Sequence, residues 1–344
     1  MPDALHHLCR HLRRRHLPHV QRKLSLLLVC LLLWSCDRKT KEPADERPTV
    51  APPKPKMLYI PRGPSDAVDL SQLGQPARGI GLDNEALSPA PGAAQCPPDM
   101  VLVAGSYCVD RYEAQLVDTV QYRLLSPHYP PSRRHTTSLL EIWQKQATTS
   151  RGILGRELNI PEPPSFQLDE DFEPRAESKP NALPSGYLTR GLAETACKNA
   201  GKRLCTRGEW VRACRGEQDR TYPYGTSYEE RTCNVHRLHH PAQLLHGNSS
   251  RHHLDPRLNL THDEDGPLLR HTGETERCHS TWGGDGIYDM VGNLDEWIVD
   301  VDGTFLGGFY ARATTAGCEA SIDSHDPGYL DYSLGTRCCR DLEP

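Results

Sequence analysis

Several residue types and patterns are scarce in this 344-residue sequence, and each scarcity excludes a class of protein. Aromatic residues make up 6% of the chain and its mean hydropathy is low, which excludes a polytopic membrane protein. Positive charge is not in excess, because 40 Lys and Arg stand against 45 Asp and Glu. Six basic residues and one acidic residue precede Cys36, so the rest of the chain carries a formal charge of −10. Such a remainder argues against a nucleic-acid partner, because binding phosphates requires clustered Lys and Arg.

The Cys-x-x-Cys spacing of structural zinc sites is also absent, although the chain has thirteen cysteines. Ten of them lie in the region that reads as globular, and this even number suits a closed set of disulfides. They are Cys96, Cys108, Cys197, Cys205, Cys214, Cys233, Cys278, Cys318, Cys338 and Cys339. Zinc is the alternative, but the adjacent Cys338 and Cys339 cannot easily share one tetrahedral site. The count favours an oxidising compartment, and by itself it leaves the connectivity open.

Only one apolar run is long enough to matter, LSLLLVCLLLWS at residues 24–35. About 12 residues are too few to span the membrane as a helix, and the arginine-rich flank is typical of a secretory signal peptide. The ending Leu-Trp-Ser-Cys resembles a bacterial lipobox. We therefore predict a lipoprotein-type signal peptide at 1–35 and an acylated Cys36. The protein would be exported and membrane-anchored through its lipid, facing the periplasm. An ordinary signal peptide or an uncleaved anchor is the alternative.

Residues 36–95 are rich in Pro, Lys, Glu and Ala and predict a flexible tether. A domain follows at 96–341. It starts with two short apolar runs around a Gly-Ser turn, which predict a hairpin near 100–112. Residues 119–180 are Pro-rich and weakly patterned, apart from a helix expected near 138–146, and predict a long surface insertion.

Two further helices are expected in the middle of this domain. One covers residues 192–199 and stops near Gly201, and the other begins at Thr206, with Glu209 completing a capping box. Residues 236–275 are rich in histidine. Zinc or copper binding there is one interpretation, but the irregular spacing favours a solvated insertion.

Six short segments occur in an order that resembles the formylglycine-generating enzyme family, also called the sulfatase-modifying-factor domain. They are GKRLCTRGEW at 201–210, ACRG at 213–216, YPYG at 222–225, GIYDMVGNLDEW at 286–297, GG at 307–308 and GTRC at 335–338. The resemblance implies an α+β domain with little regular structure, related to the C-type lectin fold and held together by disulfides.

The catalytic residues of active members have no counterpart here. Those members oxidise a sulfatase cysteine to formylglycine, using copper held by two cysteines in a segment that starts Gly-Gly-Ser-Tyr-x-Cys. Residues 307–312 read Gly-Gly-Phe-Tyr-Ala-Arg instead, so Arg312 stands where the first catalytic cysteine would be. Cys318 best matches a structural cysteine, and it is a catalytic candidate only if the shortened segment is registered differently. Copper is therefore not expected.

The resemblance also implies two disulfides, Cys197–Cys338 and Cys214–Cys318. With these assigned, the most economical pairing of the remaining six cysteines joins Cys96 to Cys108, Cys233 to Cys278 and Cys205 to Cys339.

The family further implies structural calcium, bound through oxygen atoms of the Gly-Asn-x-x-Glu segment. Asn293 and Glu296 retain these side chains, and Asn234-Val235 matches a second family site. The alternative is that Asn293 and Glu296 only hydrogen-bond a tight turn.

Three functions remain open. The first is a lipid-anchored, non-catalytic binding or regulatory module with an unidentified protein or ligand as partner. The second is an active formylglycine-generating oxidase with a rearranged site. The third is another metal-dependent oxidase on the same fold, which needs two histidines and a carboxylate around iron. Loss of both catalytic cysteines favours the first.

Overall fold

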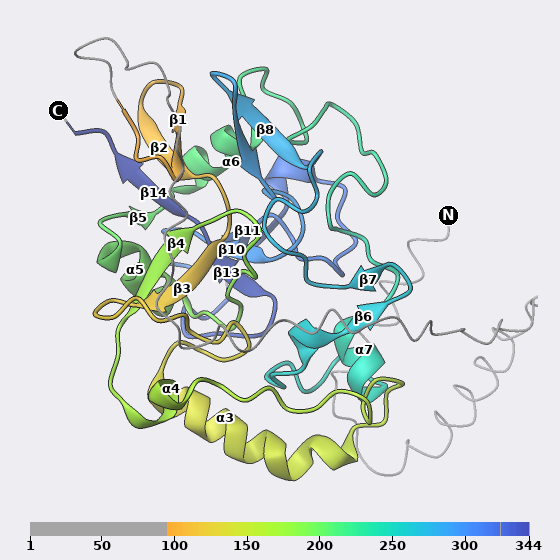
Figure 1. Ribbon diagram of the computed structural model, residues 1–344. Helices are drawn as coiled ribbons and strands as arrows, with labels where there is room; N and C mark the ends of the chain where they lie inside the picture. The colour runs from red at the N-terminus through yellow and green to blue at the C-terminus, as the bar shows by residue number, and fades with distance from the viewer. Residues whose placement is uncertain (1–94, 324, 344) are drawn as a thin grey trace, which may run out of the picture. The chain divides into compact units, whose positions relative to one another are not determined.

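The computed structural model describes residues 95–323 and 325–343 (Figure 1). The expected signal peptide, Cys36 and most of the tether lie outside the described residues. Within the described ranges, no helix is both long enough and apolar enough to cross a membrane.

One four-stranded antiparallel sheet is built from both ends of the domain, in the order β1-β2-β14-β5. The expected hairpin is confirmed: β1 (Met100–Val103) pairs with β2 (Tyr107–Asp110) across a turn in which Gly105 has a φ of +65°. On the other side of β2 lies β14 (Cys338–Asp341), which also pairs with β5 (Arg203–Leu204). The sheet therefore joins the first strands of the domain to its last.

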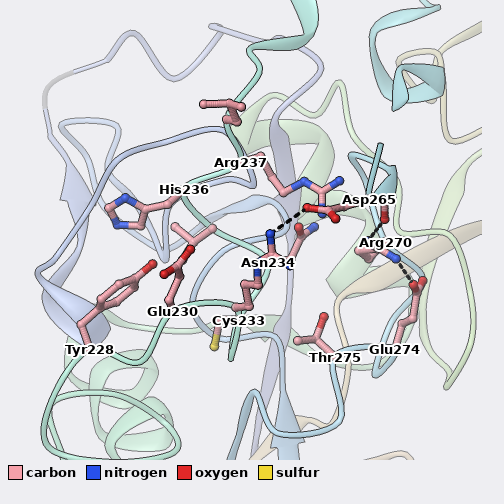
Figure 2. A pocket seen from close by; sticks show the side chains of 13 residues that line it. Tyr228, Glu230, Cys233, Asn234, His236, Arg237, Asp265, Arg270, Glu274 and Thr275 are labelled. Carbon is pink, nitrogen blue, oxygen red and sulfur yellow. Dashed lines mark hydrogen bonds and ion pairs between the residues drawn. The ribbon is translucent and has the colours of Figure 1, made fainter. Parts of the chain in front are cut away.

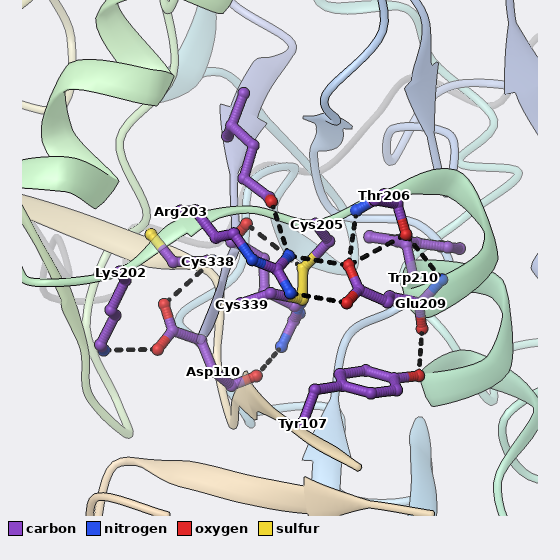
Figure 3. Close-up of a disulfide and its surroundings, with 12 residues drawn as sticks. Tyr107, Asp110, Lys202, Arg203, Cys205, Thr206, Glu209, Trp210, Cys338 and Cys339 are labelled. Carbon is purple, nitrogen blue, oxygen red and sulfur yellow. Dashed lines mark hydrogen bonds and ion pairs between the residues drawn. A yellow bond between two sulfur atoms is a disulfide. The ribbon is translucent and has the colours of Figure 1, made fainter. Parts of the chain in front are cut away.

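Two disulfides fix β14 to the middle of the chain, and Figure 3 shows the one between Cys205 and Cys339. Cys338 is bonded to Cys197 and Cys339 to Cys205. The other bridges are Cys96–Cys108, Cys214–Cys318 and Cys233–Cys278. All ten cysteines of the described domain are thus bridged, in the same five pairs that the sequence analysis gives.

A second four-stranded sheet lies at the centre of the domain, in the order β12-β11-β10-β13. β10 (Asp295–Trp297) pairs antiparallel with β11 (Phe305–Leu306) and parallel with β13 (Leu334–Thr336). One edge strand is β12 (Ser321–Ile322), which follows the 3₁₀ turn η5 (Gly317–Glu319), and the other is β13. The Trp297 side chain is fully buried, and its Nε1 donates to the carbonyl of Leu188 at 2.7 Å. This sheet carries the Gly-Asn-x-x-Glu-Trp segment into the core.

The two helices expected in the middle of the domain are confirmed. α5 (Arg190–Asn199) is followed by Gly201 with a φ of +72°. α6 (Arg207–Arg215) begins with the capping box that Thr206 and Glu209 form. Its Trp210 and Cys214 are both fully buried, as expected for residues one turn apart on the core face.

The interpretation of residues 119–180 as a surface insertion is wrong. α3 (Arg133–Gln146) starts five residues earlier than expected and is extended by η3 (Ala147–Thr149). Beyond α4 (Ser165–Asp169), β4 (Pro174–Ser178) returns to pair with β3 (Ala114–Asp118). Apolar side chains scattered among the prolines, such as Leu125 and Phe166, pack in the core with α5.

The histidine-rich segment is not a solvated insertion either. It forms α7 (Pro241–His246), η4 (Leu258–Leu260) and the short pair β6 (His262–Asp263) and β7 (Gly266–Pro267). Leucines 244, 245, 258 and 268 of this segment are buried together. A last hairpin, β8 (His279–Trp282) and β9 (Asp285–Tyr288), packs beside α6 (Figure 1).

Candidate functional site

The segment after β11 carries Arg312, at the position where active family members have a copper-binding cysteine. Its backbone lies on the turn that precedes β10, because Gly292 N donates to Gly307 O at 3.0 Å and Tyr310 N donates to Asn293 O at 3.1 Å. Gly307 has a φ of +95°, and a Cβ there would lie 3.0 Å from the carbonyl oxygen of Met290. Local packing therefore fixes the backbone of the segment that carries Arg312.

The Arg312 guanidinium is paired with the carboxylate of Asp295. Its Nη1 donates to Oδ1 at 2.9 Å, and its Nη2 lies 2.8 Å from Oδ2. The guanidinium carbon is also 5.3 Å from the ring centre of Phe309 and 5.9 Å from that of Phe305. Because a guanidinium is always protonated and has no acceptor atom, it cannot ligate a metal from this position.

Asp295 is fully buried on β10, while 24% of the Arg312 side chain is exposed. Burial raises the pKa of Asp295 to about 7; Arg312 opposes this rise, and the neighbouring charge of Asp331 adds to it. Asp295 therefore becomes protonated, and the ion pair with Arg312 is lost, as the pH falls through about 7.

Histidines and tyrosines from distant parts of the chain meet near this pair. Tyr332 Oη is 3.2 Å from His240 Nε2, and Tyr329 Oη donates to Asp331 Oδ2 at 2.7 Å. His253 Nδ1 is 4.0 Å from the same Asp331 oxygen. Burial lowers the pKa of His240, and the nearby His253 lowers it further. This arrangement is not a metal centre as it stands: within the described ranges, no three His, Cys, Asp or Glu side chains converge as ligands.

Cys318 is the other sequence candidate, and its sulfur is not a free thiol. It is bonded to Cys214 of α6 at 2.01 Å, and both residues are fully buried. The bridge ties η5 to α6. A nucleophilic or metal-binding role for Cys318 would first require reduction of this bond.

Glu296 and Asn293, the predicted calcium ligands, are committed to protein partners. Glu296 accepts hydrogen bonds from Arg337 at 3.0–3.2 Å and from Trp210 Nε1 at 2.6 Å. Asn293 Oδ1 accepts from Arg270 N at 3.0 Å and from Asn234 Nδ2 at 2.9 Å. As arranged, these side chains do not fit a calcium ion, because a guanidinium already neutralises Glu296. Calcium binding, which stays a prediction, would require Arg337 to move.

Two buried carboxylates beside this cluster were not identified from the sequence. Glu113 accepts from Leu294 N at 2.9 Å; burial raises its pKa, and the charges of Asp289 and Glu296 raise it further. Burial also raises the pKa of Asp289 to about 7. Arg337 is fully buried among them. Glu113 lies in a link between strands, where no sequence motif marks it.

A hollow of about 650 Å³ opens beside the Arg312 segment (Figure 2). The two are joined by backbone hydrogen bonds from His236 N to Arg312 O at 3.2 Å and from Arg237 N to Tyr310 O at 2.9 Å. Neither Arg312 nor Cys318 lines it. Its lining combines apolar side chains with charges of both signs: Tyr228, Glu230, Arg231, Cys233, Asn234, Val235, His236, Arg237, Leu238, Asp265, Arg270, Glu274 and Thr275. Such a surface suits a polar or zwitterionic ligand.

Residues 164–342, slightly more than half of the chain, match the model of the sulfatase-modifying factor enzyme 1-like domain, and the protein belongs to this family. Its fold is a mixed α/β fold with few helices and several disulfides. Among curated proteins, no sequence matches this chain significantly.

Several solved structures resemble the domain at low identity. The Major Tropism Determinant I1 variant has 13% identity and a TM-score of 0.37 over 73% of this chain and 54% of its own. CarF has 13% identity and a TM-score of 0.34, over 69% of this chain and 87% of its own. PvdO from Pseudomonas aeruginosa has 12% identity and a TM-score of 0.34, over 69% of this chain and 80% of its own. The chain thus spans about half the length of the Major Tropism Determinant variant. These likenesses concern the fold alone.

Proposed function

We propose that this protein is an exported, lipid-anchored member of the family whose domain does not catalyse formylglycine formation and acts as a binding or regulatory module. The observation that carries the proposal is that neither candidate position offers a free thiol. Arg312, at the position of the first catalytic cysteine, is held by Asp295. Cys318, the candidate only under a different registration of the segment, is bonded to Cys214.

The chemistry of copper supports this proposal. Cu(I) is bound by soft ligands, and two thiolates are the ligands that active family members use. All ten cysteines of the described domain are in disulfides, so no pair of thiolates is available there without reduction. The hollow beside the Arg312 segment offers a surface at which a ligand could bind without being transformed.

Anchoring rests on the sequence alone. A chain acylated at Cys36 would face the periplasm at the end of the 36–95 tether. A Cys36→Ala variant is expected to lose membrane association, measured by fractionation of expressing cells. If the variant stays membrane-bound with residues 1–35 uncleaved, the segment is an ordinary anchor and the lipoprotein proposal is wrong.

The catalytic part is tested by incubating the purified chain with Cu(I), oxygen and a sulfatase peptide that carries the Cys-x-Pro-x-Arg motif. No aldehyde is expected by mass spectrometry, while circular dichroism shows a folded domain. The Cys318→Ser variant is measured in parallel. Aldehyde formed over several turnovers by the natural chain, and abolished in a folded Cys318→Ser variant, would establish an active oxidase and overturn the proposal.

A further inference from the structure

A second hollow, of about 590 Å³, lies at the carboxyl end of α3, in the part of the domain that precedes the family motifs. Its lining has an unusual composition, because it combines two arginines and three hydroxyls with no acidic residue. The lining residues are Thr148, Thr149, Ser150, Arg151, Gly152 and Arg156. Nothing in the proposed function uses this hollow.

The backbone that carries the two arginines is held tightly against α7. Gly152 N donates to Leu245 O, and Leu154 N donates to Leu244 O, both at 3.0 Å. A Cβ on Gly152 would lie 2.0 Å from the carbonyl oxygen of Leu244, so only glycine fits there. Gly155 is similarly confined, because a Cβ there would lie 2.7 Å from the carbonyl oxygen of Leu245. Arg151 and Arg156 therefore extend from a preorganised loop.

Ser150 forms a buried, polar part of the same hollow. It is 7% exposed, and its Oγ accepts from Arg257 Nη2 at 2.7 Å and is 3.2 Å from His246 Nδ1. Arg257 is 1% exposed and also bonds the Asp255 carboxylate at 2.7 Å. The hydrogen bond from the fully buried Arg257 thus holds the Ser150 hydroxyl in place.

The charge balance of this hollow is positive. Within the described ranges, the buried Arg257 behind this hollow is paired with Asp255, and no ion pair involves Arg151 or Arg156. The carboxyl end of α3 contributes a partial charge of about −0.5. Two full positive charges outweigh it. In the hollow beside the Arg312 segment, by contrast, arginines are neutralised by Asp265 and Glu274.

We propose that this hollow binds a phosphate group, carried by a small phosphate ester or by a phospholipid headgroup. Arg151 and Arg156 would supply planar, bidentate donors for the phosphate oxygens, and the hydroxyl of Thr148 would supply a further donor. The Thr149 hydroxyl already donates to the carbonyl of Gln146 at 2.7 Å and therefore shapes the hollow without binding the phosphate. The proposal does not depend on the function proposed for the Arg312 position.

Calorimetric titration of the full chain in a neutral detergent tests this site. Inorganic phosphate, glycerol 3-phosphate and dihexanoyl phosphatidylglycerol are the three probes, with sodium chloride at equal ionic strength as reference. Saturable binding of at least one phosphate probe is expected, and the probe that binds most tightly identifies the source of the phosphate. The double variant Arg151→Met, Arg156→Met is expected to weaken that binding at least tenfold.

The matched control replaces two arginines of α3 outside the hollow, Arg133→Met and Arg134→Met, and it should bind as the natural chain does. Thermal unfolding of both variants verifies folding, since all four side chains lie on the surface. Absence of saturable binding by all three probes, or equal weakening in the two double variants, would overturn the proposal.

Discussion

Replacing Arg312 with Met removes the positive charge beside buried Asp295 while preserving contact with Phe309. Breaking a buried ion pair typically destabilises a protein by about 3–5 kcal/mol, because a charge remains without a partner. Asp295 can avoid that state. Its pKa of about 7 means that protonation neutralises it at little cost near neutral pH.

The pKa of Asp295 therefore limits how much unfolding free energy the Arg312→Met variant can lose through ionisation. If the variant keeps Asp295 protonated, this loss is RT ln(1 + 10^(pH−pKa)). With a folded pKa of about 7, it amounts to about 0.1 kcal/mol at pH 6, about 1.4 at pH 8 and about 2.7 at pH 9. The expected loss of unfolding free energy is thus small at pH 6 and increases by about 1.4 kcal/mol per pH unit above 7.

Urea unfolding followed by tryptophan fluorescence at these three pH values measures the loss. Arg133→Met is the control, because its ion pair with Asp171 is exposed and contributes at most about 1 kcal/mol at any of these pH values. A loss of 3 kcal/mol or more at pH 6, or one that does not change between pH 6 and pH 9, would refute the role assigned to Asp295.

Two further predictions concern the core around the Gly-Asn-x-x-Glu-Trp segment. The fold raises the pKa of Asp289 to about 7, so its contribution to stability is complete below the unfolded pKa and is lost as the pH rises through about 7. Asp289→Asn should therefore reduce the gain in unfolding free energy between pH 8 and pH 5 by about 2.7 kcal/mol, and an unchanged pH profile would contradict this. Gly292 has a φ of +88°, and a Cβ there would lie 2.2 Å from the carbonyl oxygen of Asn234. Gly292→Ala should cost more than about 3 kcal/mol in thermal unfolding, whereas Gly105→Ala, with φ +65° and open space, should cost only about 1–2 kcal/mol; equal losses would contradict the packing argument.

Local signals in the sequence predicted local structure well. The capping box of Thr206 and Glu209 and the turn at Gly105 depend on residues within a few positions of each other, so the sequence displays them directly. The pairing of β3 with β4 cannot be seen in this way, because α3 and α4 separate the two strands along the chain. The buried leucines of α7 and η4 were missed for the same reason: each stretch is too short to show a period, and the partners are distant.

At the candidate site, the sequence indicated which residue replaces a catalytic cysteine but not what holds it there. Arg312 was identified by its place in a motif, whereas its partner Asp295 was only one letter of another motif, with no role assigned. Glu113 was invisible for a different reason. Burial raises its pKa most, and the charges of Asp289 and Glu296, which are far away along the chain, raise it further.

The adjacent cysteines of the last strand affect how the protein can mature. Cys338 and Cys339 bond to residues 141 and 134 positions earlier, whereas Cys96 and Cys108 are only 12 apart. The first hairpin can be oxidised while the chain is still emerging from the ribosome or translocon. Cys197 and Cys205 must wait as free thiols until the chain has been made as far as Cys339. A product truncated before Cys338 lacks the native partners of both thiols, so complete oxidation of this domain reports that synthesis has passed Cys339.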